Sequence, residues 1–144
     1  MQKSTSKSGD LLVSAVLIDP VNESVLLVYD PPGRSLKRLR KMPGGKNDAG
    51  ESAIDAICRK IAAETGLIVA AGQLEEVLKI KRENGNRQRY QHIIFKAEMP
   101  LGDLKETKSG HVPRKVPLRE LFRLKDVVRM HMDVLLELRK MGVI

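Results

Sequence analysis

Residues 44–67, GGKNDAGESAIDAICRKIAAETGL, predict a glycine-rich loop that feeds directly into a helix. Ser52 is a good N-cap, and Asp55 three residues later completes a capping-box pattern with a shorter carboxylate than the usual Glu. Gly66 stands where a helix can close through a left-handed residue. Between these ends an apolar stripe recurs at helical spacing and leaves the opposite face free for chemistry; its members are Ile54, Ile57, Cys58, Ile61 and Thr65.

This stretch resembles the signature of the Nudix hydrolases, which cleave nucleoside diphosphates linked to another group. The family pattern is a Gly, five residues, a Glu, seven residues, then Arg-Glu-aliphatic-any-Glu-Glu-any-Gly-aliphatic. The positions in register are Gly45, Glu51, Arg59, Ile61, Glu64, Gly66 and Leu67. Lys60 replaces the Glu after the Arg, and Ala63 replaces the first of the paired Glu. The resemblance therefore implies a degenerate Nudix box, altered at two metal-ligand positions.

Helical geometry places positions 60, 63 and 64 within an arc of about 100°, opposite the apolar stripe. By resemblance, carboxylates there hold divalent cations that bridge a pyrophosphate and activate water. Here the arc offers one carboxylate, one methyl and one ammonium group. Lys60 precedes Glu64 by one helical turn, so we expect an ion pair that occupies this carboxylate. Metal binding should be impaired, and hydrolysis weak or absent.

The resemblance also implies roles for single residues. Glu64 is implied as a catalytic metal ligand, Glu51 as a second acid near the cation, and Arg59 as the partner of a box carboxylate. The implied cofactor is Mg²⁺ or Mn²⁺, bound more weakly than in relatives. Plain structural roles stay open, since Glu51 also suits the positive end of the helix dipole. The residues expected to bind substrate phosphates are Gly44, Gly45, Lys46, Lys60 and Arg40.

Composition describes one globular domain, which we place at residues 10–144 after a flexible N-terminus at 1–9. Cys58 is the only cysteine, so no internal disulfide forms and a cytoplasmic location is expected. No apolar run is long enough to span a bilayer, and the N-terminus lacks a secretory signal. The net charge of +8 favours anionic partners, or describes a solvated basic surface. With two Tyr, two Phe and no Trp, nucleic acid ranks below a small phosphorylated ligand.

The rest of the chain fits the same architecture. We expect a strand hairpin at 11–18 and 25–29, a basic loop at 30–41, a second hairpin at 77–82 and 87–98, and a closing helix at 125–141. The Asn-Gly pair at 84–85 predicts a tight turn with positive φ. The fold implied by resemblance is α/β, an α/β/α sandwich with a mixed central sheet between helices.

Several titratable side chains outside the box need an interpretation. His92 reads as a sheet residue with a hydrogen-bond partner rather than as a catalytic base, and His131 as a helix-surface residue. His111 and Lys108 lie in the range where relatives carry a further site residue. Acids that would supplement a reduced metal site are Glu98, Glu106, Asp48 and Asp55.

Two functional hypotheses follow. The first is a Nudix-type pyrophosphohydrolase that acts on a nucleoside diphosphate derivative through a reduced metal site. The second is a Nudix-fold binding module, without catalysis, for a phosphorylated ligand, nucleic acid or an acidic protein partner. Small members of the family often pair, so a homodimer is a further expectation, while membrane association is not.

Overall fold

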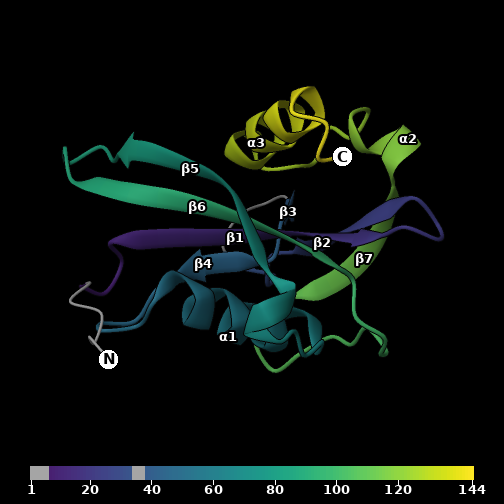
Figure 1. The fold of residues 1–144 in the computed structure, drawn as a ribbon, viewed down its shortest axis with the longest axis horizontal. Coiled ribbons are helices and arrows are strands. Elements are labelled where there is room, and N and C mark those ends of the chain that lie inside the picture. The colour runs from purple at the N-terminus through teal and green to yellow at the C-terminus, as the bar shows by residue number, and fades with distance from the viewer. Residues whose placement is uncertain (1–6, 34–37) are drawn as a thin grey trace.

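The structure is a computed structural model that describes residues 7–33 and 38–144. Most of the expected N-terminal tail (1–6), and Arg34 and Lys37 of the basic loop, lie outside the described residues. A mixed sheet forms the middle layer, with α1 against one face and α3 against the other (Figure 1). This confirms the α/β/α sandwich. No helix in the described ranges is both long and apolar enough to cross a membrane.

The opening strands form the expected hairpin. β1 (Leu11–Asp19) and β2 (Ser24–Tyr29) pair antiparallel, and both are largely buried because the sheet is covered on both faces. Asp19 closes the turn, since its Oδ1 accepts hydrogen bonds from the N–H groups of Val21 at 3.0 Å and Asn22 at 3.2 Å.

The second hairpin consists of β5 (Glu75–Glu83) and β6 (Arg89–Glu98) and extends beyond the rest of the sheet (Figure 1). Its turn corrects the prediction from Asn84-Gly85. Positive φ is carried by Arg87, at 60°, while the Asn84 side chain accepts from two backbone N–H groups further along the turn. The loop thus gains its closure from an Asn side chain rather than from a left-handed Asn-Gly pair.

Three short strands complete the sheet. β3 (Arg40–Lys41) and β7 (Val112–Pro117) pair with β2, and β4 (Gly44–Lys46) pairs with β1. β7 was not predicted from the sequence, and its Pro113 and Pro117 are unusual residues for a strand interior. Prolines are tolerated there because β7 has a neighbour along one side only in the described part of the chain.

The box helix forms as predicted. α1 (Ala53–Thr65) begins after Ser52, whose Oγ accepts from the N–H of Asp55 at 3.2 Å. It ends at Gly66, which is left-handed with φ of 78°. A 3₁₀ turn, η1 (Ala71–Gln73), then leads into β5.

The closing helix is shorter than expected. A turn of helix, α2 (Leu118–Leu121), precedes α3 (Arg129–Lys140), which buries Val134, Leu135 and Leu138 on the sheet. Its inner face also buries His131, which is 6% exposed. The prediction of His131 as a surface residue is therefore wrong.

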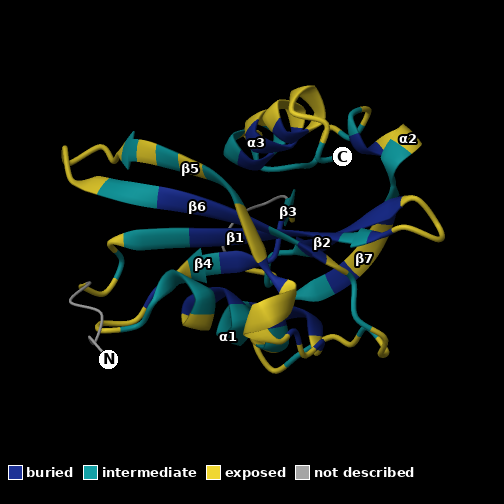
Figure 2. Ribbon diagram, in the orientation of Figure 1, coloured by how far each residue is buried: buried dark blue, intermediate teal, exposed yellow. Residues whose placement is uncertain are grey.

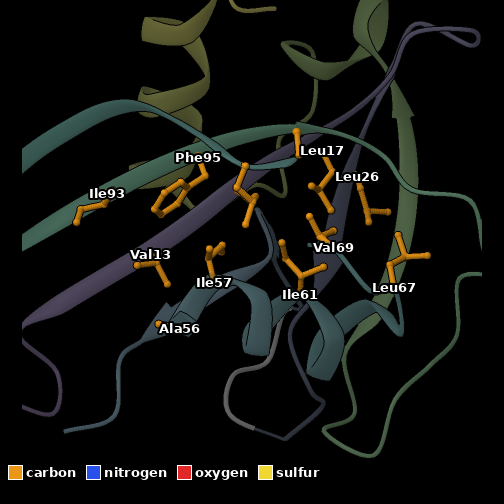
Figure 3. Close-up of a cluster of buried hydrophobic side chains, with 13 residues drawn as sticks. Val13, Leu17, Leu26, Ala56, Ile57, Ile61, Leu67, Val69, Ile93 and Phe95 are labelled. Carbon is orange, nitrogen blue, oxygen red and sulfur yellow. The ribbon is translucent and has the colours of Figure 1, made fainter. Parts of the chain in front are cut away.

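Two apolar cores hold the layers together. Successive residues of β6 point into opposite cores, as strand periodicity predicts: Ile93 and Phe95 pack in the core beside α1, and Ile94 packs in the core beside α3. Figure 3 shows the α1 core, where Ile57 and Ile61 of the helix meet β1. Figure 2 shows that the buried residues lie in the centres of the strands, while the outer faces of the helices are exposed. Each fully buried aliphatic side chain contributes about 1.5–3 kcal/mol to folding.

The sheet divides at β1, and this division positions the site. β1 pairs with β2 only near its end, at Ile18 and Asp19, whereas its start pairs with β4 at Leu12, Val13 and Ser14. β2 meanwhile continues along β3 and β7. Between the two branches a cleft opens.

Candidate functional site

The cleft has a volume of about 600 Å³ and is lined by β1, the segment from Arg38 to Gly45, α1, the loop before β7 and the start of α3. Its polar lining consists of three cationic side chains (Arg38, Lys41 and Lys60), two carboxylates (Asp30 and Glu64), two histidines (His111 and His131) and two hydroxyls (Ser14 and Ser109). We call this hollow the central cleft.

Glu64 lies in the central cleft with only 3% of its side chain exposed. Its Oε1 accepts from the Gly44 N–H at 3.0 Å and from Lys41 Nζ at 3.0 Å. Lys41 Nζ also donates to the Gly44 carbonyl at 2.9 Å. Because a buried charge needs such partners, Glu64 is satisfied inside the protein.

The expected ion pair between Lys60 and Glu64 is thus replaced by one between Lys41 and Glu64. The Lys60 side chain instead lies over Gly45, where an added Cβ would stand 2.8 Å from Lys60 Cε. Lys60 still lines the cleft, and Ala63 adds only an exposed methyl group to this part of α1. The box wall therefore presents ammonium groups where relatives are expected to present carboxylates.

Arg59 and Glu51 form a separate pair at the start of the helix. Arg59 Nε and Nη2 donate to the two Glu51 carboxylate oxygens at 2.9 Å each, and Asp48 adds its N–H at 2.9 Å. The hydrogen bond from Arg59 holds the pKa of Glu51 below its usual value. The predicted contact of Arg59 with a box carboxylate is present, but neither residue lines the central cleft.

Of the remaining residues predicted to contact phosphates, two line the central cleft and two lie outside it. Gly44 and Gly45 line the central cleft as part of a strand rather than a loop, and the Gly44 N–H already binds Glu64. Lys46 is exposed outside the cleft. Arg40 also lies outside, where it forms a two-pronged ion pair with Asp126, with its shortest contact at 2.8 Å.

His111 is the histidine nearest to the box acid. Its Nε2 lies 3.6 Å from Glu64 Oε2 and 3.9 Å from Asp30 Oδ1. Ser109 Oγ donates to the Ala63 carbonyl, so the 2.7 Å contact between Ser109 and His111 Nδ1 uses the proton on Nδ1. Burial, with help from Lys41 and Lys60, lowers the pKa of His111 despite both acids. His111 is therefore neutral near pH 7, with Nε2 as an acceptor.

His92 is fully buried and bonded on both nitrogens, as predicted for a sheet residue. Arg82 Nε donates to Nδ1 at 3.1 Å, and Nε2 lies 2.9 Å from Ser14 Oγ. Burial and the Arg82 charge lower the pKa of His92 to about 4. His131 accepts the Met42 N–H on Nδ1 at 3.0 Å, and burial with the Lys41 charge lowers its pKa to about 3.

The residues present do not fit a resident Mg²⁺ or Mn²⁺ ion. Such ions take several oxygen ligands, whereas the box offers Glu64, whose Oε1 is engaged by an ammonium and an N–H group. Within residues 7–33 and 38–144 no group of three or more His, Cys, Asp or Glu side chains is arranged to hold a metal ion. The acids expected to supplement the site, Glu98, Glu106, Asp48 and Asp55, do not line the cleft.

Sequence reasoning missed Ser14 and misplaced His131. Ser14 interrupts an apolar strand, which is a usable signal because a buried hydroxyl needs a partner. Lys41 and Arg38 were noted only as members of a basic loop. Their position in the cleft depends on the pairing of β3 with β2. This pairing cannot be predicted from the local sequence pattern.

A mixed sheet between two helices, with a capped loop–helix unit lining a charged cleft, defines a protein of the Nudix hydrolase class by resemblance. The family model described as NUDIX domain matches residues 10–137, and the chain belongs to the Nudix family. No curated protein matches the chain significantly.

Solved structures with the same fold share little sequence with the chain. A MutT protein from Methanosarcina mazei Go1 matches with a TM-score of 0.75 at 19% identity, covering 96% of this chain and 99% of its own. A NUDIX hydrolase from Nitrosomonas europaea has a TM-score of 0.74 at 19% identity, covering 91% and 88%. The NUDIX domain of Shewanella oneidensis NrtR, complexed with ADP ribose, has a TM-score of 0.73 at 19% identity, covering 94% and 89%.

Proposed function

We propose that the central cleft binds a nucleoside diphosphate derivative and that metal-dependent hydrolysis is weak or absent. Membership of the Nudix family supports a ligand of this class. So does the ADP ribose bound to the similar NUDIX domain of Shewanella oneidensis NrtR. The cleft volume of about 600 Å³ lies within the range of small-molecule sites.

The observation that carries the proposal is the 3.0 Å ion pair between Lys41 and Glu64 inside the cleft. Lys41, Lys60 and Arg38 outnumber the two carboxylates of the lining, Asp30 and Glu64. A pyrophosphate brought into the cleft therefore meets positive side chains directly. Each charge-assisted hydrogen bond of this kind is worth about 1.5–3 kcal/mol.

Lysine and a divalent metal differ in what they do next. Both neutralise phosphate charge, but an ammonium group does not lower the pKa of a bound water as a metal ion does. The cleft can bind and orient a diphosphate with the residues it has. The cleft lacks a metal site that would activate a water molecule for attack on the diphosphate.

The test measures binding and hydrolysis separately. Calorimetry with ADP-ribose and a uridine diphosphate sugar, in buffer containing EDTA, should show binding without any divalent metal. With Mg²⁺ or Mn²⁺, release of AMP from ADP-ribose and of UMP from the uridine diphosphate sugar should stay near background for the natural chain. The double variant Lys60→Glu/Ala63→Glu restores the box acids and should raise hydrolysis by at least tenfold.

A matched control makes the same charge change away from the cleft. Lys125→Glu combined with Ala70→Glu alters two exposed positions outside the cleft and should leave binding and hydrolysis unchanged. Brisk turnover by the natural chain that Glu64→Gln abolishes would overturn the proposal. Binding with no turnover in either natural chain or double variant would identify a binding module.

A second candidate, nucleic acid binding, rests on the β5–β6 hairpin. Lys79, Lys81, Arg87 and Arg89 are all exposed on this extended ribbon. Binding of a short RNA through phosphates would weaken steeply as salt rises from about 50 to 200 mM. An affinity for RNA that does not change with salt concentration, or no binding of RNA at all, would exclude nucleic acid binding through phosphates.

A further inference from the structure

The central cleft carries an unused hydrogen-bond donor on α3. His131 is 94% buried, with 6% exposed, and its Nδ1 accepts the Met42 N–H at 3.0 Å. A backbone N–H only donates, so the ring proton of the neutral His131 sits on Nε2. Nothing in the described part of the chain accepts this proton.

The Nε2–H group of His131 is not fully buried, and it belongs to a residue that lines the cleft. Among described residues, Ser24 Oγ is the only fully buried side-chain nitrogen or oxygen without a hydrogen-bond partner. His131 Nε2 also lacks a partner, so it is not fully buried, and His131 belongs to the cleft lining. A donor without a partner, on a nearly buried residue that lines a cavity, is a group that a ligand can satisfy.

A second donor is fixed nearby by three bonded residues. The Arg82 guanidinium only donates, so its 3.1 Å bond to His92 Nδ1 places the His92 proton on Nε2. That proton is donated to Ser14 Oγ at 2.9 Å. The Ser14 hydroxyl proton is therefore left for another acceptor, and no described residue takes it.

The two donors belong to one region of the cleft. The ring centres of His92 and His131 are 6.1 Å apart, and Ser14 is bonded to His92. Both Ser14 and His131 line the cleft. The two donor groups are themselves neutral, although Arg82 is bonded to His92 and the Lys41 charge acts on His131.

We propose that His131 Nε2–H, assisted by the Ser14 hydroxyl, recognises the exocyclic group at C6 of a purine or C4 of a pyrimidine, and selects a carbonyl over an amino group at that position. The inference rests on the proposed function, because it assigns a base class to the same ligand. An exocyclic amino group placed against His131 would face another donor and lose its own hydrogen bond to water. A site built this way rejects the unmatched analogue strongly.

The closing experiment compares bases that differ at one exocyclic group and the adjacent ring nitrogen. Inosine diphosphate is paired with adenosine diphosphate, and uridine diphosphate with cytidine diphosphate, in calorimetry without divalent metal. Inosine diphosphate and uridine diphosphate, which have the carbonyl at the varied position, should bind roughly tenfold or more tightly than their amino counterparts. Binding of all four nucleotides without this preference overturns the inference and leaves the proposed function standing. Absence of binding by all four overturns both.

Variants identify the residues responsible. His131→Asn keeps an acceptor for the Met42 N–H in Oδ1, and its amide N–H group is too short to reach the position of Nε2, so the preference should fall to less than threefold. Ser14→Ala should weaken binding of inosine diphosphate and uridine diphosphate by several-fold. Ser24→Ala, a buried serine on β2 outside the cleft, should change neither value. An unchanged preference in His131→Asn, or equal losses for all four nucleotides in both cleft variants, contradicts base recognition.

A spectroscopic readout does not depend on the variants. Long-range ¹H–¹⁵N NMR of the natural chain should show His92 and His131 as neutral Nε2–H forms. Inosine diphosphate should shift the His131 Nε2 signal, whereas inorganic pyrophosphate should not. A His131 proton on Nδ1, or no shift on binding, would overturn the assignment.

Discussion

At the scale of single residues, Arg59 ties the loop to the helix that follows it. Its guanidinium binds both carboxylate oxygens of Glu51, and Asp48 Oδ2 lies 3.5 Å from Arg59 Nη2. The Glu51 side chain is 16% exposed, so the pair is only partly screened by water. This contact fixes the course of the chain between β4 and α1.

Replacing Glu51 with Gln should lower the free energy of unfolding by about 1 kcal/mol at neutral pH. The folded-state pKa of Glu51 lies below its unfolded value, so its contribution is present above the unfolded value. It is lost as pH falls through the folded value. Urea unfolding of both proteins from about pH 7 to pH 3.5 should show the difference shrinking with acid. Glu106→Gln, at an exposed position, should match the natural chain throughout.

At the scale of elements, β4 lies against β1 at a distance that only glycine allows. Gly44 has φ of 150°, and a Cβ there would stand 2.0 Å from the Val13 carbonyl oxygen. The same residue donates its N–H to Glu64. One glycine thus joins β1, β4 and α1.

Gly44→Ala should therefore destabilise the fold by about 3 kcal/mol or more, because both the backbone conformation and the strand contact are lost. Gly85→Ala is the control, since nothing lies within 4 Å of its added Cβ and its φ is not positive. This variant should stay within about 0.5 kcal/mol of the natural chain. Thermal unfolding of the two variants in parallel is the measurement. Equal stability of the two would contradict the role of Gly44.

Elements with local signals were predictable, and contacts between elements were not. The start and end of α1 follow from Ser52 and Gly66, which act within one turn of the chain. The partner of Glu64 is Lys41, more than twenty residues away on β3, and periodicity carries no information about that pairing. β7 was missed for a related reason: its prolines are acceptable only at an edge, and edges are a property of the assembled sheet.

At the scale of the whole molecule, two neutral histidines lie between the sheet and α3. The pKa of His92 is lowered to about 4 and that of His131 to about 3, both chiefly by burial. The unfolded chain takes up these protons near the ordinary value of 6.5, while the folded chain does not. The folded state is therefore disfavoured as pH falls below 6.5.

Each of these histidines should remove about 1.4 kcal/mol of stability per pH unit between about pH 6 and pH 4.5. Urea unfolding across this range should show a steep decline for the natural chain and a flat profile above about pH 7. His131→Asn should reduce the slope by about 1.4 kcal/mol per pH unit. An unchanged slope would show that His131 is protonated equally in both states.

Because the sheet branches at β1, the central cleft is built from segments that are far apart in the sequence. Its walls come from the first strand, the middle of the chain and the last helix, so no fragment contains them all. A ligand that fills the cleft therefore contacts segments that are distant in the sequence and binds only the folded chain. At a free ligand concentration one hundred times the dissociation constant, it should raise the free energy of unfolding by about 2.7 kcal/mol. Proteolytic trimming of α3 would remove His131 and abolish that protection, so resistance to digestion is itself an assay of occupancy.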